Sequence, residues 1–167
     1  VLNLVFNSTN WNLTGGIGLQ ASQLIGSSSN SVYSVNRNFL NVLPSMFVHG
    51  KPGKGKRIDI FYQTNIKEPS VEQLQPVVNN SNPLNIFIGN PSLKAQYNHN
   101  TSIRYSSFNN FSFTTFFASL NVNVTNNSIV SSTSIDSFLV RSSTPINSGL
   151  SYSCSSNISF DGPVKLI

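Results

Sequence analysis

The chain has 167 residues, of which 38% are hydrophobic and only 9% are charged, and its formal net charge is +5. This length suits one domain with a sizeable core, and the apolar content excludes a disordered chain. The single cysteine, Cys154, excludes an intrachain disulfide, and its phase with apolar neighbours predicts a small buried side chain. No apolar run is long enough for a transmembrane helix, so we expect no membrane span.

Apolar residues recur at every second position along most of the chain, which is typical of β-strands separated by turns. Ser70–Gln75 is the one predicted helix, because Ser70 and Gln73 fit a capping box and Pro76 ends it. Many strands with turn signals between them favour an all-β sandwich or barrel. The predicted strands are Val1–Ser8, Trp11–Leu19, Ser31–Val35, Phe39–His49, Arg57–Gln63, Leu84–Ile88, Ser102–Ser106, Asn110–Thr125, Ile129–Ser134, Ile135–Arg141, Leu150–Phe160 and Val164–Ile167.

The alternation also predicts which side chains share a face. In Leu150–Phe160 the even-numbered residues are apolar, so we assign them to a core and Asn157 to the solvent. The apolar phase changes near Thr114–Phe117, which predicts a β-bulge. The aromatic run from Phe108 to Phe117 is expected to pack in the core of a long central strand.

Eight Asn-X-Ser/Thr sequons are the most informative local motif, because they can be glycosylated only on a secreted, exposed chain. A chain this rich in Asn, Ser and Thr would contain roughly five by chance, so the excess is modest. Each sequon Asn falls on a predicted polar strand face or at a turn, which is compatible with a coat of covalent N-glycans. The predicted acceptors are Asn7, Asn12, Asn79, Asn100, Asn110, Asn123, Asn126 and Asn157.

No residue pattern predicts catalysis, a cofactor or a metal site. The two histidines, His49 and His99, lack further ligands at suitable spacing, and the five acidic residues form no obvious pair. Gly50–Arg57 resembles a P-loop but has Arg57 where Ser or Thr should bind magnesium, and a predicted strand follows it. We interpret Lys51–Arg57 as a basic hairpin loop that could touch acidic glycans, lipid headgroups or DNA, or simply be solvated.

The N-terminal segment begins with a short strand whose apolar side chains alternate with Asn. Two interpretations are open. The strand is either the first strand of its own sheet, or it inserts into a groove on another copy and builds a head-to-tail filament. The donor-strand residues would be Val1, Leu2, Leu4, Val5 and Phe6.

This leading strand, the Ser/Thr/Asn-rich all-β body, the sequons and the absence of a disulfide resemble the thread pilins of Sulfolobus-type archaea. These are similar in build to chaperone–usher pilins. The resemblance implies an immunoglobulin-like β-sandwich over residues 11–167, completed by a donated strand from residues 1–10. It implies an extracellular, glycosylated homopolymer that serves attachment or cell–cell contact, with no enzyme activity and no nucleic-acid partner. Lys94 and Lys165 are conceivable donors for the isopeptide bonds of some such pilins.

Two other functions remain open from the sequence. A capsid or surface-layer protein with a jelly-roll-like fold would share the glycans but associate laterally. A carbohydrate-binding module would use exposed aromatic side chains such as Trp11, Tyr97 and Tyr105.

Overall fold

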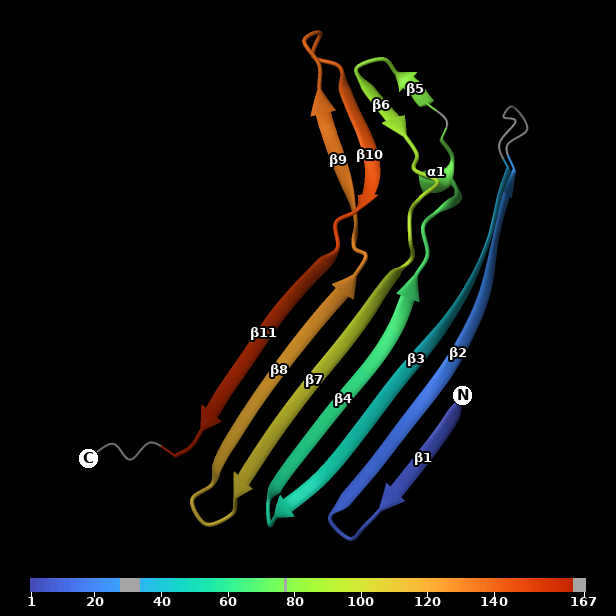
Figure 1. Cartoon of the computed structure of the whole chain (residues 1–167). Coiled ribbons are helices and arrows are strands. Elements are labelled where there is room, and N and C mark those ends of the chain that lie inside the picture. The colour runs from blue at the N-terminus through green and yellow to red at the C-terminus, as the bar shows by residue number, and fades with distance from the viewer. Residues whose placement is uncertain (28–33, 77, 164–167) are drawn as a thin grey trace.

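The computed structural model describes residues 1–27, 34–76 and 78–163, and these are mostly β-strand, as the sequence predicted (Figure 1). The strands form a seven-stranded sheet of order β1-β2-β3-β4-β7-β8-β11 and a four-stranded sheet of order β5-β6-β10-β9. The elements are β1 (Leu2–Asn7), β2 (Trp11–Ser27), β3 (Ser34–Gly53), β4 (Lys56–Lys67), α1 (Val71–Leu74), β5 (Val78–Asn82), β6 (Asn85–Ile88), β7 (Gln96–Asn109), β8 (Thr114–Asn126), β9 (Ile129–Ile135), β10 (Arg141–Asn147) and β11 (Leu150–Asp161).

The large sheet is an antiparallel meander with two unlike ends (Figure 1). Short turns join β1 to β2, β3 to β4 and β7 to β8 at one end, the lower end in Figure 1. The connections at the other end are longer, and two of them carry α1, β5, β6, β9 and β10. β1 and β11 form the two edges of this sheet, so the seven strands are a curved, open wall.

The β3–β4 turn is joined at the lower end to the last residues of β7, next to the β7–β8 turn. The Phe108 amide donates to the Gly55 carbonyl across 2.7 Å. Gly55 has a φ of +69°, and a Cβ atom there would lie 2.1 Å from the Phe108 carbonyl oxygen. Glycine is therefore needed at this position both for its conformation and for the close approach of Phe108.

A small hydrophobic core lies at the opposite end of the molecule. Val35, Leu74 and Leu93 are its buried members, and Leu24 and Val71 are among the side chains packed around them. α1 begins with the predicted capping box, in which the Ser70 hydroxyl accepts from the Gln73 amide and the Gln73 side chain accepts from the Ser70 amide. The helix is a single turn that fixes Leu74 in this core.

Several predicted boundaries are wrong. Asn110–Thr125 is not one bulged strand, because Asn110–Phe113 is the β7–β8 turn, and Phe113 has a positive φ of 50°. The predicted strand Ile135–Arg141 is mostly a turn, in which the Asp136 carboxylate accepts from the Phe138 and Val140 amides. The predicted turn Ser142–Gly149 is largely β10. Residues 31–33 and the predicted strand Val164–Ile167 lie outside the described residues.

The predicted immunoglobulin-like sandwich is also wrong. In the described part of the chain the second sheet does not cover the apolar face of the first, and only three hydrophobic residues are buried. Cys154 is exposed rather than buried, and Phe111 in the β7–β8 turn is 99% exposed. The apolar side chains are spread over one face of a single sheet, so they cannot form the core between two layers that the sandwich requires.

We predict that Gly55→Ala destabilises the fold by more than about 1 kcal/mol, because it adds left-handed backbone strain to a clash with Phe108. Denaturant unfolding of the full chain, followed by Trp11 fluorescence, measures this. Gly53→Ala is the matched control in the same turn, since a Cβ there meets nothing closer than the Lys56 side chain at 3.8 Å. Equal stabilities of the two variants would contradict the proposed contact between Gly55 and Phe108.

Candidate functional site

One face of the large sheet is apolar from edge to edge, and we call it the apolar face. Paired residues in antiparallel strands project to the same side, so the strand register places each side chain on one face. The register lines up Leu4, Gly15, Met46, Tyr62, Thr101, Val122 and Cys154 across all seven strands. The other large side chains of the apolar face are Leu2, Phe6, Trp11, Leu13, Ile17, Leu19, Leu40, Val42, Val48, Ile58, Ile60, Ile103, Tyr105, Phe116, Leu120, Val124, Leu150, Tyr152, Ile158 and Phe160.

Many of these apolar side chains are exposed to a degree unusual for a core strand. Leu4 is 83% exposed, Leu19 72% and Tyr152 78%. A water-soluble protein rarely exposes so large a continuous apolar surface. The apolar face therefore needs an apolar environment, which residues 1–27, 34–76 and 78–163 do not provide.

The opposite face, the polar face, carries mostly Asn, Gln, Ser and Thr. Its side chains form hydrogen-bonded rows across neighbouring strands: Asn98 donates to Asn65 across 2.8 Å, and Thr125 donates to Asn98 across 2.8 Å. Asn123 donates to Ser153 across 3.3 Å. Some apolar side chains, including Phe47 and Phe61, also lie on this face. Most of this face is suited to contact with water.

The ion pairs of the described residues form one group on the polar face near the short turns. The Asp59 carboxylate accepts from the Arg57 Nε–H across 2.7 Å, and His49 Nδ1 lies 2.7 Å from Asp59 Oδ1. His49 and Asp59 are directly opposite on β3 and β4, which explains their contact. This group neutralises Arg57 but contacts none of the lysines of the neighbouring turn.

Aromatic side chains on the apolar face gather at two levels. Near the short turns lie Trp11, Tyr105, Phe116 and Phe160, with the Tyr105 and Phe116 ring centroids 6.0 Å apart. The Trp11 ring covers Gly50, where a Cβ atom would lie 2.4 Å from the indole.

Toward the long connections lie Tyr97, Tyr152 and His99, and Tyr62 lies one row nearer the centre, opposite Thr101. His99 joins this group by a 2.8 Å hydrogen bond between its Nδ1 and the Tyr62 hydroxyl. Its ring centroid lies 4.8 Å from that of Tyr97. The two aromatic levels therefore bracket the apolar face from its two ends.

Comparison with known proteins shows which family the chain matches. Residues 2–166 match the family described as "Outer membrane protein beta-barrel family". The chain belongs to this family. Its fold is similar to that of the hemophore receptor HasR of Serratia marcescens, solved as a double mutant with its hemophore HasA and heme, with a TM-score of 0.66 and 10% identity. The match covers 97% of this chain and 31% of the receptor. No curated protein matches the chain by sequence.

Membership of this outer-membrane family corrects the identity that the sequence suggested. The resemblance to archaeal thread pilins is wrong, and so are the filament, the homopolymer of glycosylated subunits and the capsid or surface-layer alternative. The expected extracellular location is right only in its coarser sense, because the family is located in the outer membrane at the cell surface. Among the described residues, no helix has the length and hydropathy to cross a membrane.

The N-terminal strand takes a place in its own sheet. β1 pairs along its whole length with β2, from Leu2 opposite Ile17 to Asn7 opposite Asn12. This is the first of the two interpretations that the sequence left open. The exchange of residues 1–10 with another copy and their separation from residues 11–167 stay untested predictions. The donor role of Val1, Leu2, Leu4, Val5 and Phe6 is likewise untested.

The structure distributes the sequon asparagines unevenly over the two faces. Asn7, Asn12, Asn100, Asn123 and Asn157 lie on the polar face of the large sheet. Asn126 lies on the apolar side at the end of β8, Asn110 is in the β7–β8 turn, and Asn79 is in β5. The glycan-coated filament is overturned, whereas the occupancy of each individual sequon stays untested.

The other candidate residues are not brought together into a catalytic arrangement. His49 and His99 lie on opposite faces of the sheet. The described residues contain no group of three or more His, Cys, Asp or Glu side chains that could hold a metal ion. Lys94 lies near the long connections, where the Asn147 side chain contacts its backbone, and Lys165 lies outside the described residues. The expectation that the protein is no enzyme stays a prediction.

We predict that Gly50→Ala displaces the Trp11 ring, because the added Cβ would overlap the indole. The expected result is a shift in the emission maximum of Trp11, the single tryptophan of the chain, with the fold retained. Gly15→Ala is the control on the same face, since a Cβ there meets nothing within 4 Å. An unchanged Gly50→Ala emission spectrum would show that Trp11 does not lie over Gly50.

Proposed function

We propose that the seven strands form part of the transmembrane wall of an outer-membrane receptor or transport barrel. In this proposal the apolar face contacts lipid and the polar face lines a water-filled interior. The observation that carries it is the separation of apolar and polar side chains across all seven strands, combined with the exposure of the apolar side. Membrane barrels have this alternation, apolar outward and polar inward.

The spacing of the two aromatic levels supports the proposal. Tyr97 and Tyr105 lie eight positions apart on β7 and on the same face. At about 3.3 Å per residue this is about 26 Å along the strand, or about 20 Å along the membrane normal at a usual strand tilt. Outer-membrane barrels have an apolar band about 25 Å tall between two aromatic girdles. Trp11 and Phe160 would belong to the girdle of Tyr105 and Tyr152 to that of Tyr97, whereas Tyr62, opposite Thr101, lies between the two.

The two ends of the sheet also fit the proposal. Bacterial outer-membrane barrels have short turns on the periplasmic side and longer loops outside. The end with the β1–β2, β3–β4 and β7–β8 turns would then face the periplasm. The end with α1, the four-stranded sheet and the small core of Val35, Leu74 and Leu93 would face outward.

The open edges require further strands in a membrane. Unpaired backbone groups in hydrocarbon cost several kcal/mol each, so an exposed edge is not tolerated there. We propose that β1 and β11 each pair with another strand and that the completed wall is a closed barrel. The likeness to a much longer receptor supports a barrel larger than seven strands. The proposed role is binding and passage of solutes rather than catalysis.

The interior of this proposed barrel would favour neutral polar solutes. Most of its side chains are uncharged amides and hydroxyls, and those of Asn65, Asn98 and Thr125 are already hydrogen-bonded to one another. Asp59 is occupied by Arg57 and His49. Such a surface offers many weak hydrogen-bonding partners and few strong charges.

We predict that Val122→Arg destabilises the chain in phospholipid vesicles by about 2–4 kcal/mol, because it places a charge on the lipid side near mid-membrane. Asn121→Arg is the matched control, since it adds the same side chain one residue away on the polar face. Denaturant unfolding of both variants in vesicles gives the difference. Similar destabilisation by both, or a larger effect at Asn121, would contradict the assignment of the faces.

A further inference from the structure

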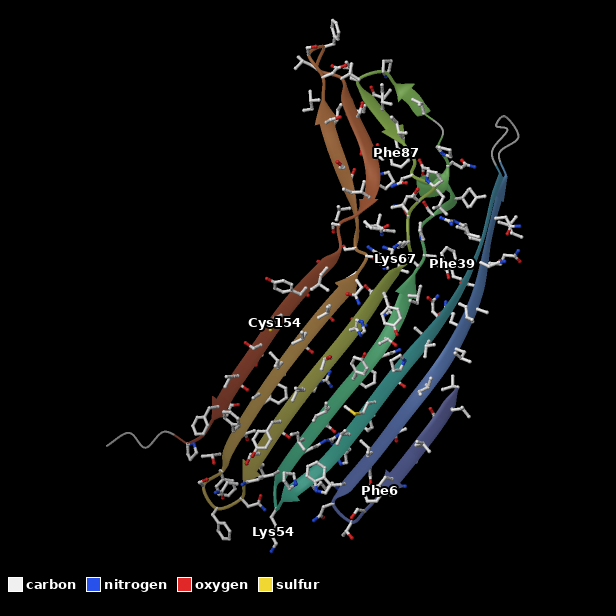
Figure 2. The ribbon with its side chains drawn as sticks, in the orientation of Figure 1. Phe6, Phe39, Lys54, Lys67, Phe87 and Cys154 are labelled. Carbon is white, nitrogen blue, oxygen red and sulfur yellow. The ribbon has the colours of Figure 1, made fainter. Side chains whose placement is uncertain are left out.

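We propose that the β3–β4 turn binds the phosphate of anionic phospholipid headgroups at the periplasmic surface of the membrane. The inference rests on the proposed membrane function and identifies the lipid class that this end of the wall selects. Four of the ten Lys and Arg residues of the chain lie within seven positions: Lys51, Lys54, Lys56 and Arg57. Lys54 is at the tip of the lower end of the sheet in Figure 2.

Three of these cations are free of carboxylate partners within the described residues. Arg57 pairs with Asp59, whereas Lys51, Lys54 and Lys56 are exposed and form no ion pair there. The other described acid at this end, Asp161, lies at the end of β11 and on the polar face. The charge of the three lysines is therefore available to an external anion.

Lys56 lies on the lipid side of the wall. The strand register places Lys56, Ser107, Phe116 and Phe160 in one row across β4, β7, β8 and β11. This row lies on the apolar face. A lysine on the lipid side is costly at mid-membrane but not at the level of the headgroups. Its position in the row of Phe116 and Phe160, at the short-turn end of the apolar face, would place its ammonium at the level of lipid phosphates.

The turn also provides a concave surface for a headgroup. An open cavity of about 600 Å³ is lined by Asn10, Lys51, Gly53, Lys54, Gly55, Lys56 and Arg57. A second cavity of about 310 Å³ is lined by Lys54, Lys56, Phe108 at the end of β7 and Phe111 in the β7–β8 turn. Lysine ammonium groups beside exposed aromatic rings suit an anionic headgroup with its acyl chains below. An acidic protein in solution could bind lysines on any exposed face, whereas Lys56 lies on the lipid side, which favours a lipid headgroup as the partner.

Trp11 is placed to report on this site. It is the only tryptophan, it lies on the apolar face, and its neighbour Asn10 lines the larger cavity. The Asn10 carbonyl also accepts from the Lys51 amide across 2.8 Å. Lipids with brominated acyl chains quench tryptophan on contact, so the quenching of Trp11 measures which lipids gather beside the turn.

The test compares brominated phosphatidylglycerol with brominated phosphatidylcholine at equal mole fraction, using the full chain in mixed vesicles. Each lysine near the surface is worth about a fivefold enrichment of anionic lipid. We expect at least this preference for phosphatidylglycerol in the unaltered chain. The double variant Lys54→Gln/Lys56→Gln should lose most of it, whereas the charge-matched control Lys67→Gln/Lys94→Gln, changed near the opposite end, should keep it.

The possible outcomes separate the two proposals. If both brominated lipids quench Trp11 equally, the chain is in the membrane but the turn does not select anionic lipid, and the inference fails alone. If neither lipid quenches Trp11, the proposed membrane function fails and the inference fails with it. If the chain shows no preference for phosphatidylglycerol, but inorganic phosphate shifts the Trp11 emission when chloride of the same ionic strength does not, the turn takes free phosphate and the lipid assignment is wrong.

Discussion

The structure depends on one constraint: in hydrocarbon, each backbone N–H and C=O must find its partner within the protein. The long antiparallel ladders satisfy it over most of the sheet. β2 and β3 pair without interruption from Trp11 to Ser27, and β7 and β8 pair from Tyr97 to Asn109. β3 and β4 are not paired on the N-terminal side of Ser45, and there side chains donate to the free carbonyls of β3. The Thr64 hydroxyl donates to the Pro44 carbonyl, and the Tyr97 hydroxyl donates to the Val42 carbonyl.

Once the ladders fix the register, alternation fixes the chemistry of both faces. A single sheet has no second layer against which its apolar side chains can be buried. It therefore needs an apolar medium on one side and water on the other. Membership of an outer-membrane family allows such a pair of media, and the proposed function assigns lipid to the side of Leu4 and Val122 and water to the side of Asn98 and Asn123. The few buried side chains around Leu74 are confined to the long-connection end, where proteins of this architecture extend beyond the membrane.

The sequence predicted correctly which side chains of a strand share a face. It was wrong in assigning the apolar face to the core of a sandwich. It placed Leu2, Leu4 and Phe6 together, and the even residues of Leu150–Phe160 together, and the strand register confirms both groupings. It then assigned them to a core, because a period of two is the same in a half-buried strand and in a membrane strand. Nothing in an isolated alternating segment tells whether its apolar side meets protein or lipid.

Other errors had local causes. Asn110–Phe113 interrupts an alternating pattern with two more Phe residues, so the hydrophobic signal hid a turn whose Phe side chains are exposed. The sequence allows Trp11, Tyr97 and Tyr105 to form a sugar-binding surface, but the register distributes them over two levels of the apolar face. Their spacing along β7 was available in the sequence and was the signal that could have indicated a membrane strand.

The low charge of the chain acquires a physical reason from this arrangement. A charged side chain on the apolar face would have to reach a headgroup or be buried at a cost of several kcal/mol. Charge is therefore confined to the polar face, the turns, the long connections and strand ends at the level of the headgroups, such as Lys56. On the polar face Arg104 is the cation nearest the Asp59 group, directly opposite Asp59 on β7. The abundance of Asn, Ser and Thr that suggested a glycan coat is, on this account, a consequence of lining an aqueous interior without charge.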